Sequence, residues 1–359
     1  MKVEELLGRN VFEYDKDLFI STVNEAYSNW KKNDNYNKRI QMQESPEEIS
    51  KISDIYQVPL IDMVEFKELS DLINRDHPLK LNNNISLKNS IYSSGTTKGN
   101  QSIVPHSEEG LSLQQKYFHK LAPEIVTNID LMHVIAPSES DMEKLPENQK
   151  NKAVMKYAKW GFLEPFKSKA FVKIGKEGII PQFSELEESL KKEPGNKAIF
   201  APPLYVDMFI SYLENKNSKI DLGDRGIITT AGGWKGMNGR SKEDFRSRME
   251  EFLGINKKNH VDFYGFSESM IPAGNRAGDS NPDMKRIPSQ GFVFVADQEV
   301  FLNNGEIKKV NEGKEGLAVF IDPLNPDYPG AILTDDIVRK VGGDYGKDVR
   351  IEYLRRATE

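Results

Sequence analysis

The chain of 359 residues is 38% hydrophobic and 29% charged, and it carries a formal net charge of −6. Its length favours two or three subdomains over one ordinary core. The acidic balance argues against a nucleic-acid partner, because such binding generally needs a basic surface. The sequence has no run of about 20 apolar residues that would span a bilayer, and its first residues lack the apolar stretch of a secretory signal. We therefore expect a cytoplasmic protein with no transmembrane segment.

The sequence contains no cysteine, which removes disulfides, thiolate metal ligands and cysteine nucleophiles together. Its histidines are scattered without the spacing of a metal site, at His77, His106, His119, His133 and His260. We interpret each as an ordinary surface or core histidine, so a structural metal site is not expected.

The first 80 residues read as a helical segment that packs on the rest of the protein. Apolar residues between positions 12 and 30 recur close to every 3.6 positions, which predicts a helix. The polar stretch at residues 31–38 is typical of a solvated loop. Ser45 and Pro46 have the residue types of a helix cap and a first helical position, so we expect a helix from there to about Ile55.

Between residues 81 and 290 the pattern alternates between strands and helices, which predicts an α/β nucleotide-binding core. Sheets of this kind bind ligands at the carboxyl ends of their strands. The expected strands are residues 85–91, 131–136, 169–174, 197–200, 227–230 and 261–264, and the expected helices are residues 108–121, 183–192 and 205–215.

Residues 291–359 change character and predict a smaller β-rich subdomain. Residues 292–295 and 317–320 are apolar runs of strand type. The Asn303-Asn304-Gly305 turn favours a hairpin between Val300 and Ile307. A later apolar run is expected to end, as a strand, at the acidic pair Asp335-Asp336.

One loop carries small and hydroxyl-bearing residues that suit phosphate binding. Residues 92–100 read Tyr-Ser-Ser-Gly-Thr-Thr-Lys-Gly-Asn and follow the first strand of the core. Amides and hydroxyls from Ser93 to Thr97 can surround phosphate oxygens, and Lys98 can add a positive charge. The spacing is not that of a Walker A loop. Alone, such a run is more often an ordinary polar turn.

A pair of glycines follows the strand at residues 227–230 and supports a ligand site. The run reads Ala-Gly-Gly-Trp-Lys-Gly from residue 231. Gly232 and Gly233 at a strand end let a flat ring lie directly on the backbone. A tight strand-to-helix turn, with Trp234 packing against it, explains the same residues equally well.

A third motif favours a nucleotide as that ligand. Residues 262–268 read Asp-Phe-Tyr-Gly-Phe-Ser-Glu and leave the end of another strand. Tyr264 can stack on a base, Ser267 can bind a phosphate, and Glu268 can hold Mg²⁺. A carboxylate at Asp336 can bind ribose hydroxyls, although an acidic surface turn is the commoner meaning of such a pair.

In this order the motifs resemble those of the adenylate-forming (acyl-activating) enzyme superfamily. That superfamily has a Ser/Thr-rich phosphate loop, a glycine pair near the adenine, a Tyr-Gly-x-Thr/Ser-Glu motif and a Thr-Gly-Asp ribose motif. Phenylacetate-CoA ligase-like enzymes are one similar group within it. The sequence is most similar to the LuxE-like acyl-protein synthetases, from about residue 55 onward, on the runs Val58-Pro59-Leu60, Glu65-Phe66-Lys67, Ser93 to Thr97 and Gly232 to Lys235.

The resemblance implies a role for each residue that matches a motif. Thr96, Thr97 and Glu268 would be the catalytic residues, and Glu268 would also hold the metal. ATP and Mg²⁺ are the implied cofactors. The residues that would bind ATP are Ser93, Ser94, Gly95 and Lys98 in the phosphate loop, Gly232, Gly233, Trp234, Tyr264 and Gly265 near the adenine, Ser267 at the α-phosphate, Asp336 at the ribose and Arg356 at the hinge.

Several positions depart from the superfamily pattern. Lys98-Gly99-Asn100 replaces the usual Gly-x-Pro-Lys, and Thr334-Asp335-Asp336 lacks the central glycine. Typical members continue beyond the position of Glu359 into a mobile C-terminal lobe with a catalytic lysine, so we expect that lobe to be largely absent here. LuxE-type synthetases pass the acyl group to a cysteine of their own, which this sequence lacks. Either it stops short of that residue, or the acyl group passes directly to a partner.

We therefore predict an α/β protein with a large adenylation-type core and a smaller β-rich subdomain. The predicted function is ATP-dependent activation of a carboxylic acid, of the fatty-acid class, as an acyl-adenylate. The expected acyl acceptor is a protein, either a reductase or a carrier, or the thiol of CoA. Two alternatives remain at this point: a phenylacetate-type acyl-CoA ligase, and a non-catalytic adenylation domain that only binds nucleotide or a partner.

Overall fold

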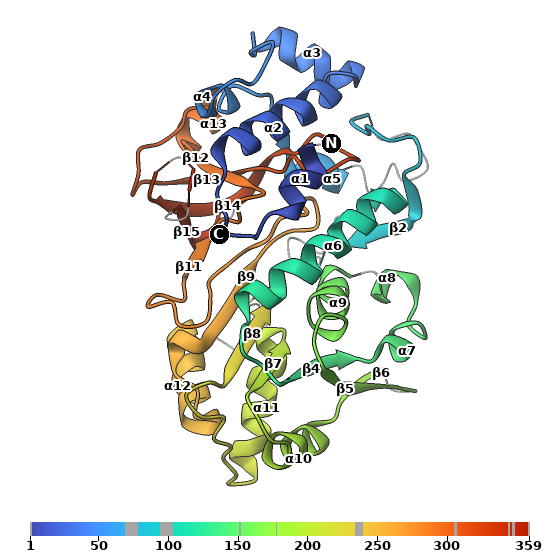
Figure 1. Cartoon of the computed structure of the whole chain (residues 1–359), viewed down its shortest axis with the longest axis vertical. Helices are drawn as coiled ribbons and strands as arrows, with labels where there is room; N and C mark the ends of the chain where they lie inside the picture. Colours follow the sequence, from blue (N-terminus) through green and yellow to red (C-terminus); the bar gives the residue numbers. More distant parts are fainter. Residues whose placement is uncertain are drawn as a thin grey trace.

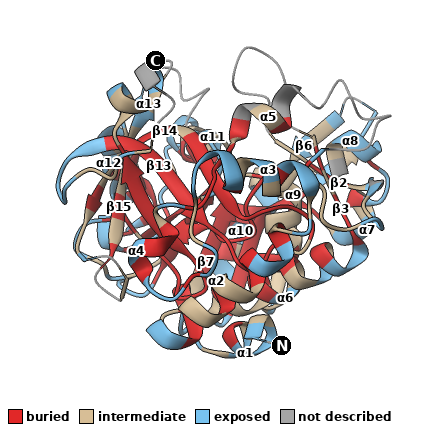
Figure 2. Ribbon diagram, turned by 90° about the horizontal axis from the view of Figure 1, so that it is seen from above, coloured by how far each residue is buried: buried red, intermediate tan, exposed pale blue. Residues whose placement is uncertain are grey.

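The computed structural model of the chain describes residues 2–68, 78–93, 103–150, 152–176, 178–233, 240–304, 307–343, 345–346 and 349–357. Within these ranges one mixed sheet of 13 strands runs through the molecule, and a two-stranded sheet lies apart from it. Helices lie against the large sheet along its length (Figure 1). Buried residues are concentrated along its strands, β13 and β14 among them (Figure 2).

Five neighbouring strands form the parallel half of the sheet, in the order β5, β4, β7, β8 and β9. β4 and β8 are buried at every position, as expected for strands that are covered on both faces. The strands are β4 (Leu131–Pro137), β5 (Ser168–Gly175), β7 (Lys197–Ala201), β8 (Ile227–Ala231) and β9 (His260–Tyr264), with β6 (Gly178–Pro181) antiparallel at the edge. These strands agree closely with those predicted from the sequence.

Three helices lie around this parallel half, in the lower part of Figure 1. They are α10 (Phe183–Lys192), α11 (Pro203–Asn215) and α12 (Lys242–Leu253). The buried apolar side chains of these helices form a hydrophobic core cluster with those of the strands; Ile199, Phe209 and Phe245 belong to it. A short 3₁₀ turn (Lys257–Asn259) then leads into β9.

Apart from the short β1, the remaining strands of the large sheet are antiparallel and come from the last third of the chain. They are β10 (Ala273–Gly274), β11 (Met284–Arg286), β12 (Phe292–Ala296), β13 (Glu315–Ile321), β14 (Ala331–Val341) and β15 (Arg350–Arg356). β10 pairs with β9, so the antiparallel strands extend the parallel half without a break. The separate sheet pairs β2 (Ser86–Tyr92) with β3 (Ile103–His106).

The N-terminal elements pack on the antiparallel half, where the blue and red segments meet in Figure 1. The Tyr14 hydroxyl donates to the Ile287 carbonyl oxygen at 2.6 Å, and the Phe19 ring stacks on Tyr345 at 4.6 Å. β1 also pairs in parallel with β14. The elements are α1 (Lys2–Gly8), α2 (Lys16–Trp30), α3 (Asp34–Met42), α4 (Ile52–Ile55), β1 (Ile61–Asp62) and α5 (Met63–Glu68).

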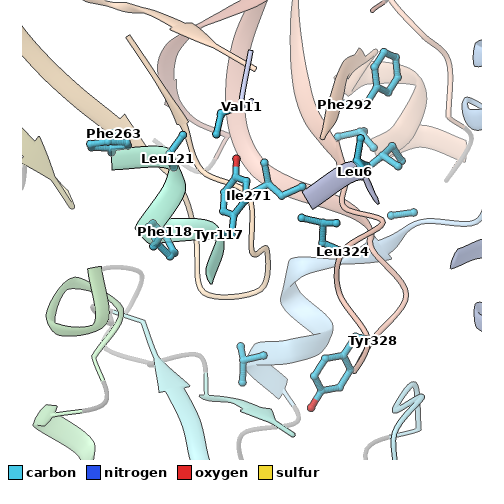
Figure 3. Close-up of a cluster of buried hydrophobic side chains, with 14 of the residues drawn as sticks. Leu6, Val11, Tyr117, Phe118, Leu121, Phe263, Ile271, Phe292, Leu324 and Tyr328 are labelled. Carbon is cyan, nitrogen blue, oxygen red and sulfur yellow. The ribbon is translucent and has the colours of Figure 1, made fainter. Parts of the chain in front are cut away.

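The long helix α6 (Glu108–Ile125) crosses the middle of the molecule and joins its parts. The Ser107 side chain caps its first turn by accepting from the Gly110 amide. Its buried face supplies Tyr117, Phe118 and Leu121 to a cluster that also contains Leu6 from α1 and Phe263 from β9 (Figure 3). Short helices α7 (Glu139–Met142), α8 (Glu147–Lys150) and α9 (Ala153–Tyr157) and a π-helical turn (Ala158–Leu163) follow β4.

Four local predictions were wrong. Residues 34–42 form α3 instead of a solvated loop, because Tyr36 and Ile40 are buried. Ser45 and Pro46 do not start a helix, since the next helix begins only at Ile52. Val300 lies in helix α13 (Gln298–Asn304), so there is no hairpin to Ile307. The strand that reaches Asp335 and Asp336 does not end there but continues to Val341.

Candidate active site

Three of the predicted site residues meet directly, although they are far apart in the sequence. The Tyr264 hydroxyl donates a hydrogen bond of 2.6 Å to the Asp336 carboxylate. The Arg356 guanidinium lies 3.6 Å from the other Asp336 oxygen and 3.1 Å from Asp335. One carboxylate is thus held between a phenol and a cation.

The register of the sheet explains why these three side chains are in contact. Asp336 in β14 lies directly opposite Arg356 in β15, and Tyr264 ends β9. Asp336 points inward and is 3% exposed, while its neighbour Asp335 is only partly buried. This alternation follows from the two-residue period of a strand, and it separates the roles of the two acids.

The electrostatics of the group keep Tyr264 protonated and Arg356 charged. Burial, together with the Asp336 carboxylate, raises the pKa of Tyr264 well above its ordinary value. Burial alone would lower the pKa of Arg356, but the Asp336 and Asp335 carboxylates raise it above its ordinary value. Tyr264 therefore remains a hydrogen-bond donor at neutral pH.

The glycine pair lies beside Tyr264 at the same edge of the sheet. β8 and β9 are parallel, with Ala231 opposite Phe263, so Gly232 and Tyr264 follow at neighbouring strand ends. Gly232 has a φ of +102°, which non-glycine residues rarely adopt, and a β-carbon built there would meet no atom of the described residues within 4 Å. As far as the described residues go, the space above Gly232 is open, which suits the approach of a flat ring.

The segment after Tyr264 turns back into the protein with Ser267 and Glu268. The Ser267 hydroxyl donates to the Glu268 carboxylate at 3.1 Å, and the two residues are 3% and 2% exposed. A β-carbon added to Gly265 would lie 3.1 Å from the Pro272 Cβ and 3.4 Å from the Tyr157 hydroxyl, so glycine permits the close approach of Pro272, with Tyr157 beside it. Burial and the Glu268 carboxylate both raise the pKa of Tyr157.

No sequence motif points to Tyr157. It lies at the end of α9, directly before the π-helical turn, and its ring packs on Phe118 at 4.6 Å. π-Helical turns often occur at functional sites, but the residues that form one cannot be read from sequence periodicity. Its position against Gly265 depends on contacts between segments more than 100 residues apart.

The predicted phosphate loop is only partly within the described residues. Ser93 follows β2 directly. Ser94, Gly95, Thr96, Thr97 and Lys98 lie outside the described ranges, as does Trp234 beside the glycine pair. Among the described residues, the structure therefore brings Tyr264, Asp336 and Arg356 into contact and sets Gly232 at the neighbouring strand end, and Glu268 follows Tyr264 by four positions.

Asp322 is a second residue that the sequence analysis missed. It follows β13, is fully buried, and accepts hydrogen bonds from the Met270 amide at 2.7 Å and the Ser269 hydroxyl at 3.2 Å. It therefore holds the backbone directly after Glu268. Burial raises the pKa of the Asp322 carboxyl to about 6, although hydrogen bonds from the Met270 and Leu324 amides lower it part of the way back.

This raised pKa predicts a pH-dependent contribution to stability. Between about pH 4 and pH 6 the folded state holds a proton on Asp322 that the unfolded chain has lost, so the stability that Asp322 contributes falls as pH rises. From a shift of roughly two units, the free energy of unfolding of wild type relative to Asp322→Asn should fall by about 3 kcal/mol between pH 4 and pH 7. Denaturant unfolding of both proteins across this range measures the difference. A difference in unfolding free energy between the two proteins that stays constant with pH would contradict the raised pKa of Asp322.

One cavity of about 170 Å³ lies beside the π-helical turn. Three lysines and two glutamates line it together with the apolar side chains of two methionines and Trp160. The residues that line it are Lys88, Met142, Glu143, Glu147, Met155, Lys156, Lys159 and Trp160. Phe162 and Phe200 are not among the residues that line this cavity. Their rings stack on each other at 3.9 Å inside the core.

Among the described residues, no group of three or more His, Asp or Glu side chains gathers where a metal ion could bind. Protein-bound Mg²⁺ often uses only one or two carboxylates together with substrate phosphates, so Glu268 alone fits such a site.

No helix in the described part of the chain is long and apolar enough to cross a membrane.

The fold is shared with an acyl-CoA ligase of the adenylate-forming class. The chain matches the crystal structure of 2-hydroxyisobutyryl-CoA ligase in an open conformation with 2-HIB-AMP and CoA, with a TM-score of 0.66 and 13% identity over 95% of this chain and 69% of that chain. The post-adenylation structure of that ligase, with 2-HIB-AMP, gives a TM-score of 0.66 and 13% identity over 98% and 70%. The adenylation-type core predicted from the sequence is confirmed.

The family follows from the sequence itself. The acyl-protein synthetase LuxE family matches residues 11–359, and the chain belongs to that family. A curated relative, the long-chain-fatty-acid–luciferin-component ligase of Aliivibrio fischeri, is 25% identical over 173 residues. That match covers 46% of this chain and 43% of the relative, so it spans under half the length of either protein. The predicted family is therefore confirmed.

Proposed function

We propose that this protein activates a carboxylic acid with ATP. A carboxylate oxygen of the acid attacks the α-phosphorus, the bond from that phosphorus to the pyrophosphate breaks, and acyl-adenylate and pyrophosphate result. The observation that carries the proposal is the meeting of Tyr264, Asp336 and Arg356 beside the open backbone of Gly232. This arrangement supports the proposal, because a nucleotide needs a flat surface for its ring next to a polar group for its ribose.

The proposed roles follow from this arrangement. The adenine lies over Gly232 and Gly233 beside the Tyr264 ring, and the ribose hydroxyls donate to Asp336. Arg356 holds Asp336 in place, since its guanidinium lies 3.6 Å from the carboxylate oxygen that Tyr264 does not bind. Ser267 and Glu268 face the α-phosphate. Positioning and charge neutralisation then supply the catalysis, without a nucleophile from the protein.

Glu268 fits a Mg²⁺ site whose other ligands come from the nucleotide. The ion, when bound, neutralises charge on the phosphates. Ser267 keeps one oxygen of Glu268 oriented by its hydrogen bond of 3.1 Å. We assign the phosphate-loop roles to Ser93 and to Ser94, Gly95, Thr96, Thr97 and Lys98 from the motif alone.

We infer that the acid is a fatty acid and that the acyl group passes to a protein or thiol acceptor. Support comes from the family and from the similarity to a ligase whose name specifies long-chain fatty acids. The sequence has no cysteine, so no acyl-cysteine can form on the residues present. A cytoplasmic location remains a prediction from the sequence.

Acid-dependent exchange of pyrophosphate into ATP tests this function. We expect exchange with saturated fatty acids of some chain lengths, none without an acid, and none when Mg²⁺ is withheld. Adding CoA separates the acceptors, because a CoA ligase would form acyl-CoA in place of a stable acyl-adenylate. Binding of ATP without exchange on any acid in a broad panel would contradict the proposal and favour a non-catalytic domain.

A further inference from the structure

A buried turn between β13 and β14 contacts two segments that each follow a predicted site motif in the sequence. Residues 322–330, here called the proline turn, read Asp-Pro-Leu-Asn-Pro-Asp-Tyr-Pro-Gly. Three prolines restrict its backbone. The Asn325 side chain accepts from the Asp327 and Tyr328 amides at 3.0 and 3.3 Å. A β-carbon on Gly330 would lie 1.8 Å from the Asp322 carbonyl oxygen, so the turn closes tightly on itself.

The first end of the proline turn holds the segment that carries Glu268. One Asp322 oxygen accepts from the Met270 amide and the Ser269 hydroxyl, and the other accepts from Leu324 at 3.1 Å. These residues are all 3% exposed or less. Leu324 packs in the same cluster as Ile271, so apolar contacts fix the segment as well (Figure 3).

The second part of the proline turn holds the chain that follows the Ser93–Lys98 motif. One Asp327 oxygen lies 3.0 Å from the His106 Nδ1 and accepts from the Ser107 amide at 3.0 Å. The Tyr328 hydroxyl donates to the Pro105 carbonyl oxygen at 2.8 Å. Gly110 leaves room for this carboxylate, because a β-carbon there would lie 2.1 Å from it. Asp327 thus sits at the N-terminus of α6, where the helix dipole favours a negative charge.

We propose that the proline turn is a rigid bridge that sets the position of Glu268 relative to β3 and α6, with Asp322 and Asp327 as its two positioning residues. The inference rests on the proposed function, because it assigns Glu268 to the reacting phosphate. Asp322 acts through the backbone of residues 269 and 270 and touches no substrate. Its effect should therefore appear in the rate of chemistry more than in the binding of ATP.

Steady-state exchange kinetics of Asp322→Asn at pH 7.5, well below the melting temperature of the variant, test the bridge. Asparagine has a single accepting oxygen, so its NH₂ group must face either the Leu324 amide or the Met270 amide and the Ser269 hydroxyl, and the anchor of the Glu268 segment is weakened. We expect kcat to fall by at least about 10-fold, with the KM for ATP within about threefold of wild type, because small misplacements of reacting groups cost this much. The matched control is Asp297→Asn, which also loses a carboxylate bonded to two backbone amides, of Glu299 and Val300, at the start of α13.

If the Asp322→Asn protein folds but does not show this fall in kcat with a nearly unchanged KM for ATP, the proposed bridge is wrong. An unchanged kcat, or a rise in KM alone, would be such a result. If that variant does not fold, Ser269→Ala decides, because it removes one bond to Asp322 and should lower kcat by at least about threefold. In the Glu268→Gln background the further loss from Asp322→Asn should be under about twofold if Asp322 acts through Glu268. An active wild type with unaffected variants overturns only the bridge. A wild type without exchange overturns the proposed function and the bridge together.

Discussion

Glutamine in place of Glu268 is expected to lower the rate of acid-dependent ATP–pyrophosphate exchange by at least about 100-fold, the usual effect of removing one electrostatic group at the reacting centre. The side chain is 2% exposed and is held by Ser267, so the substitution changes its charge more than its shape. The Mg²⁺ concentration needed for half-maximal exchange should rise, because the amide is a weaker ligand than the carboxylate. Titration of exchange against Mg²⁺ in both proteins measures the two effects.

Glu109→Gln is the matched control for this substitution. Glu109 is exposed in the first turn of α6. The Glu109→Gln variant should catalyse ATP–pyrophosphate exchange at the wild-type rate. Exchange by Glu268→Gln within about threefold of wild type, in a protein with an unchanged melting temperature, would rule out a role for this carboxylate at the phosphate.

Lys285→Met is expected to lower the free energy of unfolding by about 3–5 kcal/mol, the cost of leaving one member of a buried ion pair alone. Lys285 is 1% exposed, and its ammonium group donates to Asp262 at 2.9 Å and to the Pro282 carbonyl oxygen at 2.9 Å. Thr230 donates to the second Asp262 oxygen at 2.7 Å. Burial alone would raise the pKa of Asp262, but Lys285 and other nearby cations hold it below its ordinary value, so the carboxylate stays charged.

Urea unfolding midpoints of three variants test this prediction. Lys314→Met, at an exposed lysine, should change stability by less than about 0.5 kcal/mol. The double variant Asp262→Asn with Lys285→Met should be more stable than the sum of the two single effects predicts, because no charge is then left unpaired. If Lys285→Met lowers the free energy of unfolding by less than about 1 kcal/mol, water already reaches the ion pair of Lys285 and Asp262. Asp262 lies two residues before Tyr264, so this pair also supports the strand that presents the site.

The parallel half of the sheet could be predicted closely from the sequence, because its signals are local. Residues 227–231 form a β-branched, apolar run, and the helix at residues 183–192 has a strong periodicity, and both elements occur where expected. The wrong predictions concern segments where tertiary contacts override local preference. Tyr36 is fully buried and its hydroxyl donates to the Pro59 carbonyl oxygen, which draws a polar stretch into helix α3.

Local signals misled at two further places for the same reason. Ser45 and Pro46 suit a helix start, but the Tyr27 hydroxyl donates to the Pro46 carbonyl oxygen and Asn24 accepts from the Ile49 amide. These bonds fix residues 45–49 as an irregular segment. Asp297 accepts from the amides of Glu299 and Val300, and this cap starts helix α13 where the Asn-Gly turn suggested a hairpin.

The candidate site was predictable as a set of motifs but not as a geometry. Tyr264 and Asp336 are 72 positions apart, and only the pairing of β14 with β15 explains why Arg356 reaches the same carboxylate. Tyr157 and Asp322 belong to no motif, because their roles depend on the backbone of Gly265 and Met270 that they approach. Residues that support a site through backbone contacts leave little trace in a single sequence.

The central claim is that a carboxylate oxygen of the acid attacks the α-phosphorus of ATP. Fatty acid labelled with ¹⁸O in its carboxylate, incubated with the protein, ATP, Mg²⁺ and hydroxylamine to trap the acyl group, tests it directly. The predicted result is one ¹⁸O atom in AMP and none in inorganic phosphate, read by mass spectrometry. The label in inorganic phosphate, or in neither product despite turnover of ATP, would contradict acyl-adenylate formation.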